Sequence, residues 1–246
     1  MRIAVAGASG VAGRHVVAEL GRRGHDAVAL ARSLGVDVTQ ANGLAEHLAG
    51  ADAVIDALNI TTMRRKPATD FFATTTRNLL AAEREAGVER HVLLSIVGID
   101  GSSFGYYRAK EAQAKLAREL NPDTVILRAT QFHEFAGQML ERSSIGPVVI
   151  TPRMRSATVA ATEVAAALVD LAESGEPGVT VELGGPEAHD MPDLVRQVAE
   201  RRGSRAKVVG VALPGAAGRE MTDGRLIPSA PWRTGTQTFS DWLAEN

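Results

Sequence analysis

The chain has 246 residues, a formal net charge of −2 and no cysteine. A nearly neutral chain lacks the basic surface of a general nucleic-acid binder, and without cysteine it has no disulfide, no thiolate nucleophile and no cysteine-held zinc or iron–sulfur centre. No apolar run reaches the roughly 18 residues of a membrane span, and the start has no signal-peptide pattern, so we expect a cytoplasmic protein without nucleic-acid or membrane partners.

Short apolar runs alternate with helix-like stretches over the first 130 residues or so. Apolar runs that are continuous rather than alternating are typical of strands in a parallel sheet covered on both faces. This alternation predicts right-handed βαβ units and the α/β class, with a doubly wound, Rossmann-type parallel sheet. The expected strands are 3–6, 27–30, 53–58, 91–94 and 124–127, with a small one near 36–38, and the expected helices are 11–23, 44–48, 70–86 and 106–120.

A glycine-rich turn joins the first expected strand to the first helix. Its sequence, Gly7-Ala8-Ser9-Gly10-Val11-Ala12-Gly13, has the pattern G-x-x-G-x-x-G. The first glycine permits a tight turn, the second lets the backbone approach a pyrophosphate, and the third allows close packing of helix on strand. Free N–H groups at the helix start attract phosphate. A tight turn without a ligand is the alternative, but the position between a buried strand and an amphipathic helix favours a dinucleotide site.

The residue after the second strand bears on the choice of nucleotide. An NAD-specific site places an acidic residue there, whereas this chain has Arg32. A guanidinium can pair with a 2′-phosphate, so Arg32 predicts NADP(H) in preference to NAD(H), and an arginine that merely faces solvent is the alternative.

Later strand ends should line the same crevice. Asp56 either caps the loop near residues 61–62 or contacts a ligand. The other expected cofactor contacts are Asp37 and Val38 beside the adenine, and Ala57, Leu58 and Asn59, where small residues let the cofactor lie flat.

The two tyrosines of the chain are adjacent, and Tyr106 stands four residues before Lys110 at the start of an expected helix. This spacing places both side chains on one helix face, where we expect the ammonium to lower the pKa of the phenol. Tyr106 could then exchange a proton with a carbonyl or alcohol while a hydride moves, and Lys110 could hold the nicotinamide ribose. A half-buried tyrosine and a surface lysine are the alternative, but a preceding strand that ends at Ser95 favours catalysis.

These segments resemble the short-chain dehydrogenase/reductase superfamily, and more closely its atypical, NmrA-like NAD(P)-binding branch. The resemblance implies a Rossmann fold and a catalytic group in which Tyr106 is the acid/base, Lys110 its activator and Ser95 the group that polarises the substrate carbonyl. The serine match departs from the family pattern, because the alignment can place Ile96 or Val97 at that position. The matching segments are 7–13, 24–25, 30–32, 76–80, 94–100, 106–110 and 127–132.

The segment after residue 127 is the expected substrate side. The end of that strand faces the nicotinamide in a sheet of this type, so its aromatic and polar residues predict a pocket for a flat or apolar substrate. His133 could donate to a substrate oxygen, and packing against the C-terminal part is the equal alternative. The expected substrate contacts are Thr130, Phe132, His133 and Phe135.

Beyond about residue 130 glycine–proline turns separate shorter elements, with helices expected at 162–173 and 190–202. We expect one domain over residues 1–246, with a dinucleotide-binding core over about 1–160 and a small, mixed α/β substrate-side portion over about 161–246. Basic runs at 63–66 and 153–155 lie in expected loops, where they either grip an anionic substrate or are simply solvated. No motif has metal-site spacing, so no metal is expected.

Together these features predict an NADPH-dependent reductase of a carbonyl or activated alkene in a small, partly aromatic molecule. Two alternatives come from other classes. One is a non-enzymatic NADP(H) sensor that regulates a partner protein, because members of the NmrA-like branch that lack the full catalytic group act as redox sensors. The other is an epimerase or dehydratase that uses the cofactor transiently. The expected partner is a small-molecule substrate, and a homodimer is left open.

Overall fold

The computed structural model describes residues 1–62 and 64–246, and its contacts divide the chain into two compact units. Unit 1 comprises residues 1–96, 104–128 and 162–181, and unit 2 comprises residues 97–103, 129–161 and 182–246. Each unit is thus built from three separate stretches of chain rather than from the residues on one side of position 160. Met63, which begins the first basic run, lies outside the described residues.

The central sheet has seven strands in the order β12-β9-β5-β4-β3-β1-β2, which confirms the expected α/β, Rossmann-type class. The chain runs from β1 outward to β2 and then returns past β1 to β3, and both neighbours of β1 are parallel to it. The strand order therefore reverses beside β1, where open α/β sheets form ligand sites. The strands are β1 (Arg2–Ala6), β2 (Asp26–Leu30), β3 (Ala53–Asp56), β4 (Arg90–Ile96), β5 (Val125–Ala129), β9 (Thr180–Gly184) and β12 (Arg233–Thr234).

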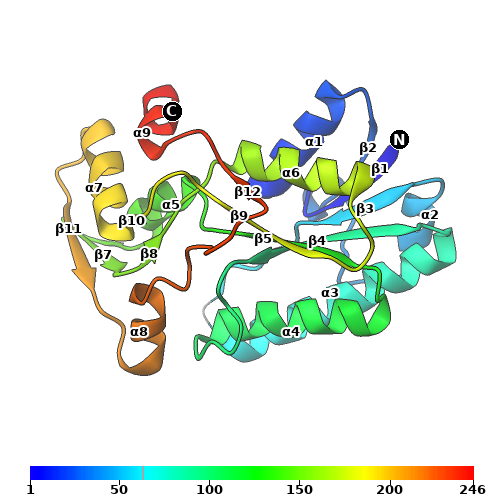
Figure 1. The fold of residues 1–246 in the computed structure, drawn as a ribbon, viewed down its shortest axis with the longest axis horizontal. Coiled ribbons are helices and arrows are strands. Elements are labelled where there is room, and N and C mark those ends of the chain that lie inside the picture. Colours follow the sequence, from blue (N-terminus) through cyan, green and yellow to red (C-terminus); the bar gives the residue numbers. More distant parts are fainter. Residues whose placement is uncertain (63) are drawn as a thin grey trace. The chain divides into compact units, whose positions relative to one another are not determined.

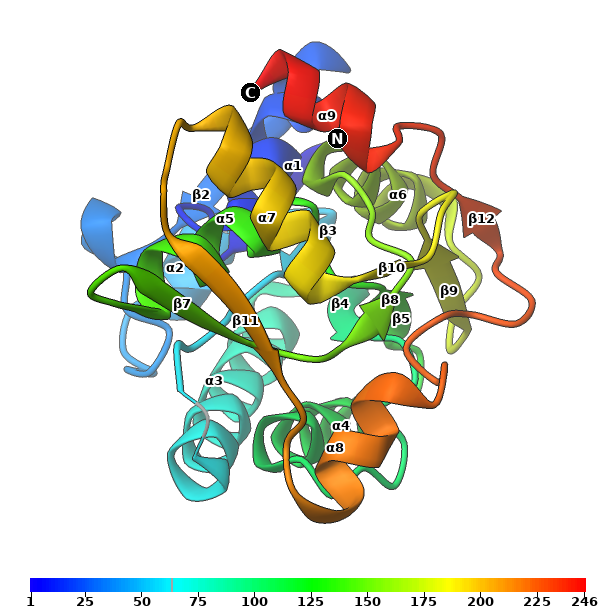
Figure 2. The same cartoon turned by 90° about the vertical axis from the view of Figure 1, so that its left-hand side faces the viewer.

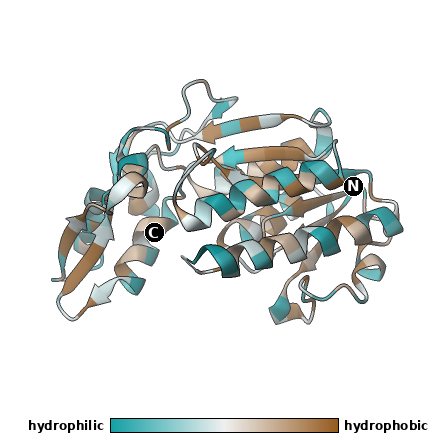
Figure 3. Ribbon diagram, turned by 90° about the horizontal axis from the view of Figure 1, so that it is seen from below, coloured by the Kyte–Doolittle hydropathy of each residue, from teal (hydrophilic) through white to brown (hydrophobic). Residues whose placement is uncertain are grey.

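Helices cover both faces of the sheet in unit 1. Figure 1 shows α3 and α4 on one face and α1 and α6 on the other. Hydrophilic and hydrophobic residues alternate along α3 and α4, the helices in front of the sheet in Figure 3, so that each can bury one side and expose the other. In the described residues no helix is long and apolar enough to cross a membrane. The helices are α1 (Val11–Arg22), α2 (Leu44–Leu48), α3 (Arg65–Ala86), α4 (Gly105–Leu120) and α6 (Ala161–Ser174).

The small strand expected near 36–38 is wrong. A 3₁₀ turn, Arg32–Leu34, follows β2 and ends at Gly35, which has a φ of +83° that favours glycine. Val36 and Val38 are buried nevertheless, because they pack in a core cluster with residues of α2 and α3. The apolar pattern of this segment thus reflects burial without a strand, and β2 is the last strand on its side of the sheet.

The basic runs also differ from expectation. Arg65 and Lys66 form the first turn of α3 instead of a loop, so this helix begins five residues before its expected start at 70. Lys66 pairs with Asp70 at 2.7 Å on the exposed side of the helix. Arg155 lies in the short strand β8, Arg155–Ser156. These side chains are solvent-facing charges of regular elements.

Unit 2 contains two small sheets, β11-β7-β6 and β10-β8, which the sequence did not predict. Helix α7, one of the two helices expected beyond residue 130, packs on β7 and β11 (Figure 2). The elements are α5 (Glu134–Arg142), β6 (Ser144–Ile145), β7 (Val148–Pro152), β8, β10 (His189–Asp190), α7 (Met191–Arg201), β11 (Lys207–Val211), α8 (Gly215–Thr222) and α9 (Phe239–Glu245).

Arg23, directly after α1, connects this helix to α6. Its guanidinium donates to Glu19 at 2.7 Å, to Asp170 at 2.6 Å and to Glu173 at 2.8 Å, and its side chain is 20% exposed. The preceding residue, Arg22, bonds Glu19 alone and its side chain is 71% exposed. Two neighbouring arginines thus have very different surroundings.

We expect Arg23→Met to lower the free energy of unfolding by about 2 kcal/mol, because it removes the ion pairs of Arg23 with Asp170 and Glu173, two partly buried carboxylates of α6. The matched change Arg22→Met should cost less than about 0.5 kcal/mol, since exposed pairs contribute little. Urea unfolding of both variants measures the difference. Equal losses would show that the connection to α6 does not contribute to stability.

Candidate functional site

The glycine-rich turn between β1 and α1 has the geometry that its sequence predicts. Gly7 has a φ of +82°, and a Cβ there would lie 2.8 Å from the carbonyl oxygen of Ala57. A Cβ on Gly13 would lie 2.1 Å from the carbonyl oxygen of Gly7, which no side chain can do. Gly10 precedes the first residue of α1 and supplies no side-chain cap. The first N–H groups of α1 are therefore available to phosphate oxygens, and the dipole of the helix favours a negative charge there.

The turn lies where the strand order reverses. Ala57 directly follows β3, and its N–H donates to the carbonyl of Ala6 at the end of β1, at 3.0 Å. Gly7 in turn donates to Leu30 at the end of β2, at 3.0 Å. The carboxyl ends of β1, β2 and β3 thus meet around the glycines, as the crevice rule for parallel sheets requires.

The segment after β2 is held by its own side chains. Arg32 is exposed and begins the 3₁₀ turn. Oδ1 of Asp37 accepts from the N–H and the hydroxyl of Thr39, at 2.9 and 2.8 Å, and these bonds, aided by the charge of Arg32, lower the pKa of Asp37. Val38 is buried in the core, and its carbonyl accepts from Asn78 at 3.0 Å. These bonds hold residues 37–39 in place beside the exposed guanidinium of Arg32.

Tyr106 lies in the first turn of α4, with its hydroxyl directed at the loop after β3. The hydroxyl donates to Oδ1 of Asn59 at 2.7 Å. The ring of Tyr106 is 6.0 Å from that of Phe72, and burial raises the pKa of the phenol. The expected lowering of this pKa by Lys110 is wrong for the arrangement seen here, because desolvation outweighs any effect of the ammonium.

Lys110 lies one turn further along α4 and points inward. It is 5% exposed, and Nζ donates to the carbonyl of Leu94 at 2.9 Å and to Oε1 of Gln113 at 2.6 Å. Nζ also lies 4.6 Å from the centre of the Phe72 ring, a favourable cation–π distance. Burial lowers the pKa of Lys110 to about 8.

Asp56, at the end of β3, is fully buried and completes this group. Oδ2 accepts from Nε2 of Gln113 at 3.1 Å, and Oδ1 accepts from the N–H of Leu58 at 3.0 Å. Of the two roles considered for Asp56, capping a loop fits the structure better than contacting a ligand. The N–H that Asp56 caps belongs to Leu58, however, and not to a residue near 61–62. Gln113 was missed by sequence reasoning, because a glutamine three residues after a lysine is common on any helix.

Ser95 is the second-last residue of β4 and is 2% exposed. Strand residues alternate between faces, so Ser95 lies on the same face as Leu93, which packs on α3 and α4. Its hydroxyl oxygen has no hydrogen-bond partner among residues 1–62 and 64–246. A buried hydroxyl without a partner is unusual, and it lies next to Leu94, whose carbonyl holds Lys110.

The expected substrate residues lie in unit 2, and two of them are engaged in packing. His133 is 1% exposed, its Nε2 contacts the carbonyl of Gln237 at 3.1 Å, and its Nδ1 contacts the hydroxyl of Thr158 at 2.9 Å. Because a carbonyl only accepts, Nε2 must donate inward, so the packing alternative describes His133 better than donation to a substrate. Thr130 is likewise buried and donates to the carbonyl of Ala157. Phe132 and Phe135 are half-buried.

A pocket of about 590 Å³ in unit 2 was not anticipated. It begins at Val97 and Gly98, the residues directly after β4, and continues along residues 223–229. A Cβ on Gly98 would lie 1.9 Å from the carbonyl oxygen of Arg225, so the two stretches of main chain touch. The glycine at position 98 is the sequence signal for this contact, because the main chain there has a φ of +72°, which favours glycine.

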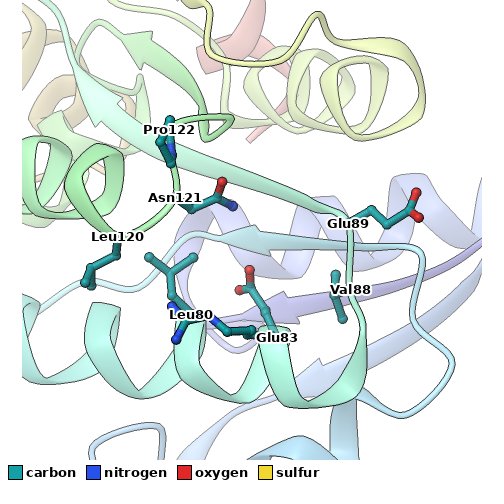
Figure 4. Close-up of a pocket in the computed structure, with 8 residues that line it drawn as sticks. Leu80, Glu83, Val88, Glu89, Leu120, Asn121 and Pro122 are labelled. Carbon is teal, nitrogen blue, oxygen red and sulfur yellow. The ribbon is translucent and has the colours of Figure 1, made fainter.

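A smaller pocket, of about 260 Å³, lies in unit 1 (Figure 4). Leu80 and Glu83 of α3 line one side, and Leu120 and Pro122 at the end of α4 line another. Val88, which also lines it, precedes β4, so this pocket lies at the amino end of that strand. It is separate from the group formed by Tyr106 and Lys110 at the opposite end.

Comparison with known proteins identifies a family and a set of similar structures. Residues 7–174 match the model of a family described as NAD(P)H-binding. No match was found among curated protein sequences.

Three solved structures share the fold over nearly the whole chain. The UDP-N-acetylglucosamine 4-epimerase from Bacillus cereus is 15% identical with a TM-score of 0.73, covering 100% of this chain and 97% of the other. The NADPH-dependent quinone oxidoreductase from Escherichia coli, in complex with NADPH, is 18% identical with a TM-score of 0.71, covering 99% of each. A short-chain dehydrogenase/reductase superfamily protein from Agrobacterium tumefaciens, with bound NAD, is 20% identical with a TM-score of 0.70, covering 100% and 95%. These similarities confirm the expected Rossmann-type fold, and the family match confirms the expected NAD(P)-binding family.

We expect Gly13→Ala to lower the free energy of unfolding by about 1–3 kcal/mol, because the new methyl group must displace the Gly7 carbonyl. Gly21→Ala, in the same helix, should raise it by about 0.5–1 kcal/mol, because the methyl group meets open space and alanine favours a helix. Thermal or urea unfolding measures both. A neutral Gly13→Ala would mean that the turn is looser than described.

Proposed function

We propose, from the premise that the chain belongs to the NAD(P)H-binding family that its residues 7–174 match, that it is an NADPH-dependent oxidoreductase. It would reduce a carbonyl or activated alkene of a small, partly aromatic molecule. The observation that supports this most is that Tyr106 and Lys110, four residues apart on α4, contact residues at the carboxyl ends of β3 and β4. The glycine-rich turn follows the carboxyl end of β1 on this same side of the sheet.

Residues of unit 1 would hold the cofactor along this edge. The N–H groups at the start of α1 would bind the pyrophosphate, with Gly7 and Gly13 keeping the turn free of side chains. Arg32 would pair with the 2′-phosphate in the forked geometry of a guanidinium. Ala57 and Leu58 lie beside Gly7 and, with Asn59, would line the path toward Lys110. When bound, the nicotinamide supplies the hydride.

Tyr106 would supply the proton. The phenol is protonated at neutral pH, as a proton donor to a carbonyl must be, but burial raises its pKa, so bound cofactor and substrate would have to lower that pKa for efficient proton transfer. To reach a substrate, its hydroxyl would leave Oδ1 of Asn59, which it contacts in this structure. The hydroxyl of Ser95, near the carboxyl end of β4, has no hydrogen-bond partner among the described residues and would donate to the substrate oxygen.

A cofactor-sensing role is the second candidate. It is favoured by the bond of Tyr106 to Asn59 and by its raised pKa, since both describe a stable neutral phenol. An epimerase that uses the cofactor transiently is the third candidate, because an epimerase shares this fold. A panel of quinones, enones and aldehydes separates them: net oxidation of NADPH supports the reductase, product without net oxidation an epimerase, and inertness the sensor.

Tyr106→Phe should lower kcat by at least about 100-fold, the usual contribution of a general acid, while NADPH affinity changes little. Tyr107→Phe is the matched control, because it removes the adjacent and more buried phenol and should retain turnover. Steady-state kinetics and fluorescence titration with NADPH give the two readouts. Full activity in Tyr106→Phe would remove this residue from the mechanism.

Arg32→Ala should weaken NADPH binding by about 10- to 100-fold, the value of a charge-assisted hydrogen bond, and leave NADH binding unchanged. Titration with both nucleotides measures the ratio, and NADH serves as the internal control. The preference for NADPH is contradicted if the wild-type protein binds NADH more tightly, or if the ratio is the same in the variant.

A further inference from the structure

We propose that Gln113 and Asp56 are positioning residues for Lys110, which orient its ammonium and keep one N–H of that group directed at the cofactor. The inference rests on the proposed function, because the ammonium has a ligand to hold only if a nicotinamide ribose binds beside it. Gln113 and Asp56 are 1% and 0% exposed, so neither can contact a ligand in this structure. Any effect they have on binding or turnover passes through Lys110.

Asp56 sets the orientation of the Gln113 amide. A carboxylate only accepts, so it takes the amide N–H at 3.1 Å and leaves the amide oxygen facing Lys110 at 2.6 Å. With the amide reversed, its NH₂ group would face an ammonium, and both groups are donors. The second oxygen of Asp56 is held by the N–H of Leu58 at 3.0 Å. The orientation therefore follows from the end of β3, where Asp56 is fixed to the backbone.

The number of N–H donors on the Lys110 ammonium indicates what these bonds do. An ammonium has three N–H donors, and those of Lys110 serve Leu94 and Gln113, at 2.9 and 2.6 Å. The described residues supply no third hydrogen-bond acceptor to Nζ. The two bonds limit the direction of the remaining N–H, and a ribose hydroxyl would take this N–H in preference to the face of the Phe72 ring, whose centre is 4.6 Å from Nζ. A lysine without Gln113 would lose this constraint.

The charges around Lys110 are few, which makes its titration a clear readout. The Coulombic influence on it comes from Asp56 of β3, which opposes the lowering of its pKa to about 8 by burial. From α3 it faces the uncharged ring of Phe72. The charge of Asp56 also contributes to raising the pKa of Glu83 and that of His91, a buried pair 2.8 Å apart. Tyr106, on the same helix, is neutral well above pH 8 because burial raises its pKa.

The test is Gln113→Met, which keeps the length of the side chain and removes both of its hydrogen bonds. The ammonium loses an acceptor while its burial is unchanged, so the pKa of Lys110 should fall by about 1, the effect of one bond to a charged group. Lysine Nζ titration by NMR in the protein alone measures this directly. The charged form exists below the pKa, so the pH above which NADPH affinity declines should fall by the same amount.

Asp56→Asn is the second variant, because it keeps the cap on Leu58 but can release the amide orientation. It should move both readouts in the same direction, by releasing the amide and by removing the negative charge that raises the pKa of Lys110, so the double variant should exceed Gln113→Met by the charge effect alone. Lys115→Gln, at an exposed position of α4 paired with Glu111, is the matched control and should change neither.

Unchanged titration of Lys110 in a folded Gln113→Met, or in Asp56→Asn if the first does not fold, overturns the positioning role. A shift of the titration without a shift in the pH profile of NADPH affinity also overturns it, because Gln113 would then affect the charge alone. If the wild-type protein does not bind NADPH, the proposed function fails, and this outcome is distinct because the Lys110 titration needs no cofactor.

Discussion

Three stretches of main chain meet without intervening side chains where the strand order reverses. Gly13 lies against the carbonyl of Gly7, and Gly7 lies against that of Ala57, so the start of α1 and the ends of β1 and β3 approach as closely as backbones can. This contact determines where α1 begins and where its free N–H groups point. It also brings Ala57 and Leu58 beside the turn, and the next residue, Asn59, accepts the hydrogen bond of Tyr106. The remaining parts of the candidate site are arranged around this approach.

Much of the sheet follows from local sequence. The apolar runs at 3–6 and 91–94 form largely buried strands, and the run at 27–30 forms the half-buried last strand of the sheet; such runs are evident without knowledge of their neighbours. The segment 36–38 has the same apolar character but packs on α2 and α3 as a turn, because periodicity reports burial and not hydrogen-bond pairing. The strands of unit 2 that have two residues each are too short to show any period.

The site is predictable where it depends on helical spacing and unpredictable where separate elements meet. Tyr106 and Lys110 share α4, so their proximity follows from a separation of four residues. Their partners Asn59, Asp56 and Leu94 come from other elements, and no spacing relates them. The direction of the Tyr106 pKa was expected wrongly for the same reason, because it depends on burial, which one helix does not determine.

The order in which the chain builds its units has a consequence for synthesis. Unit 1 begins at residue 1 but includes residues 162–181, so α6 is made long after β1 and α1. Until then Arg23 has only Glu19 to pair with, and the face of the sheet that α6 covers is open to solvent. Contacts between residues about 150 apart close late and slowly, because the loop between them must first be ordered. A nascent chain of this protein therefore exposes an apolar sheet face for much of its translation, the stage at which a chaperone would act.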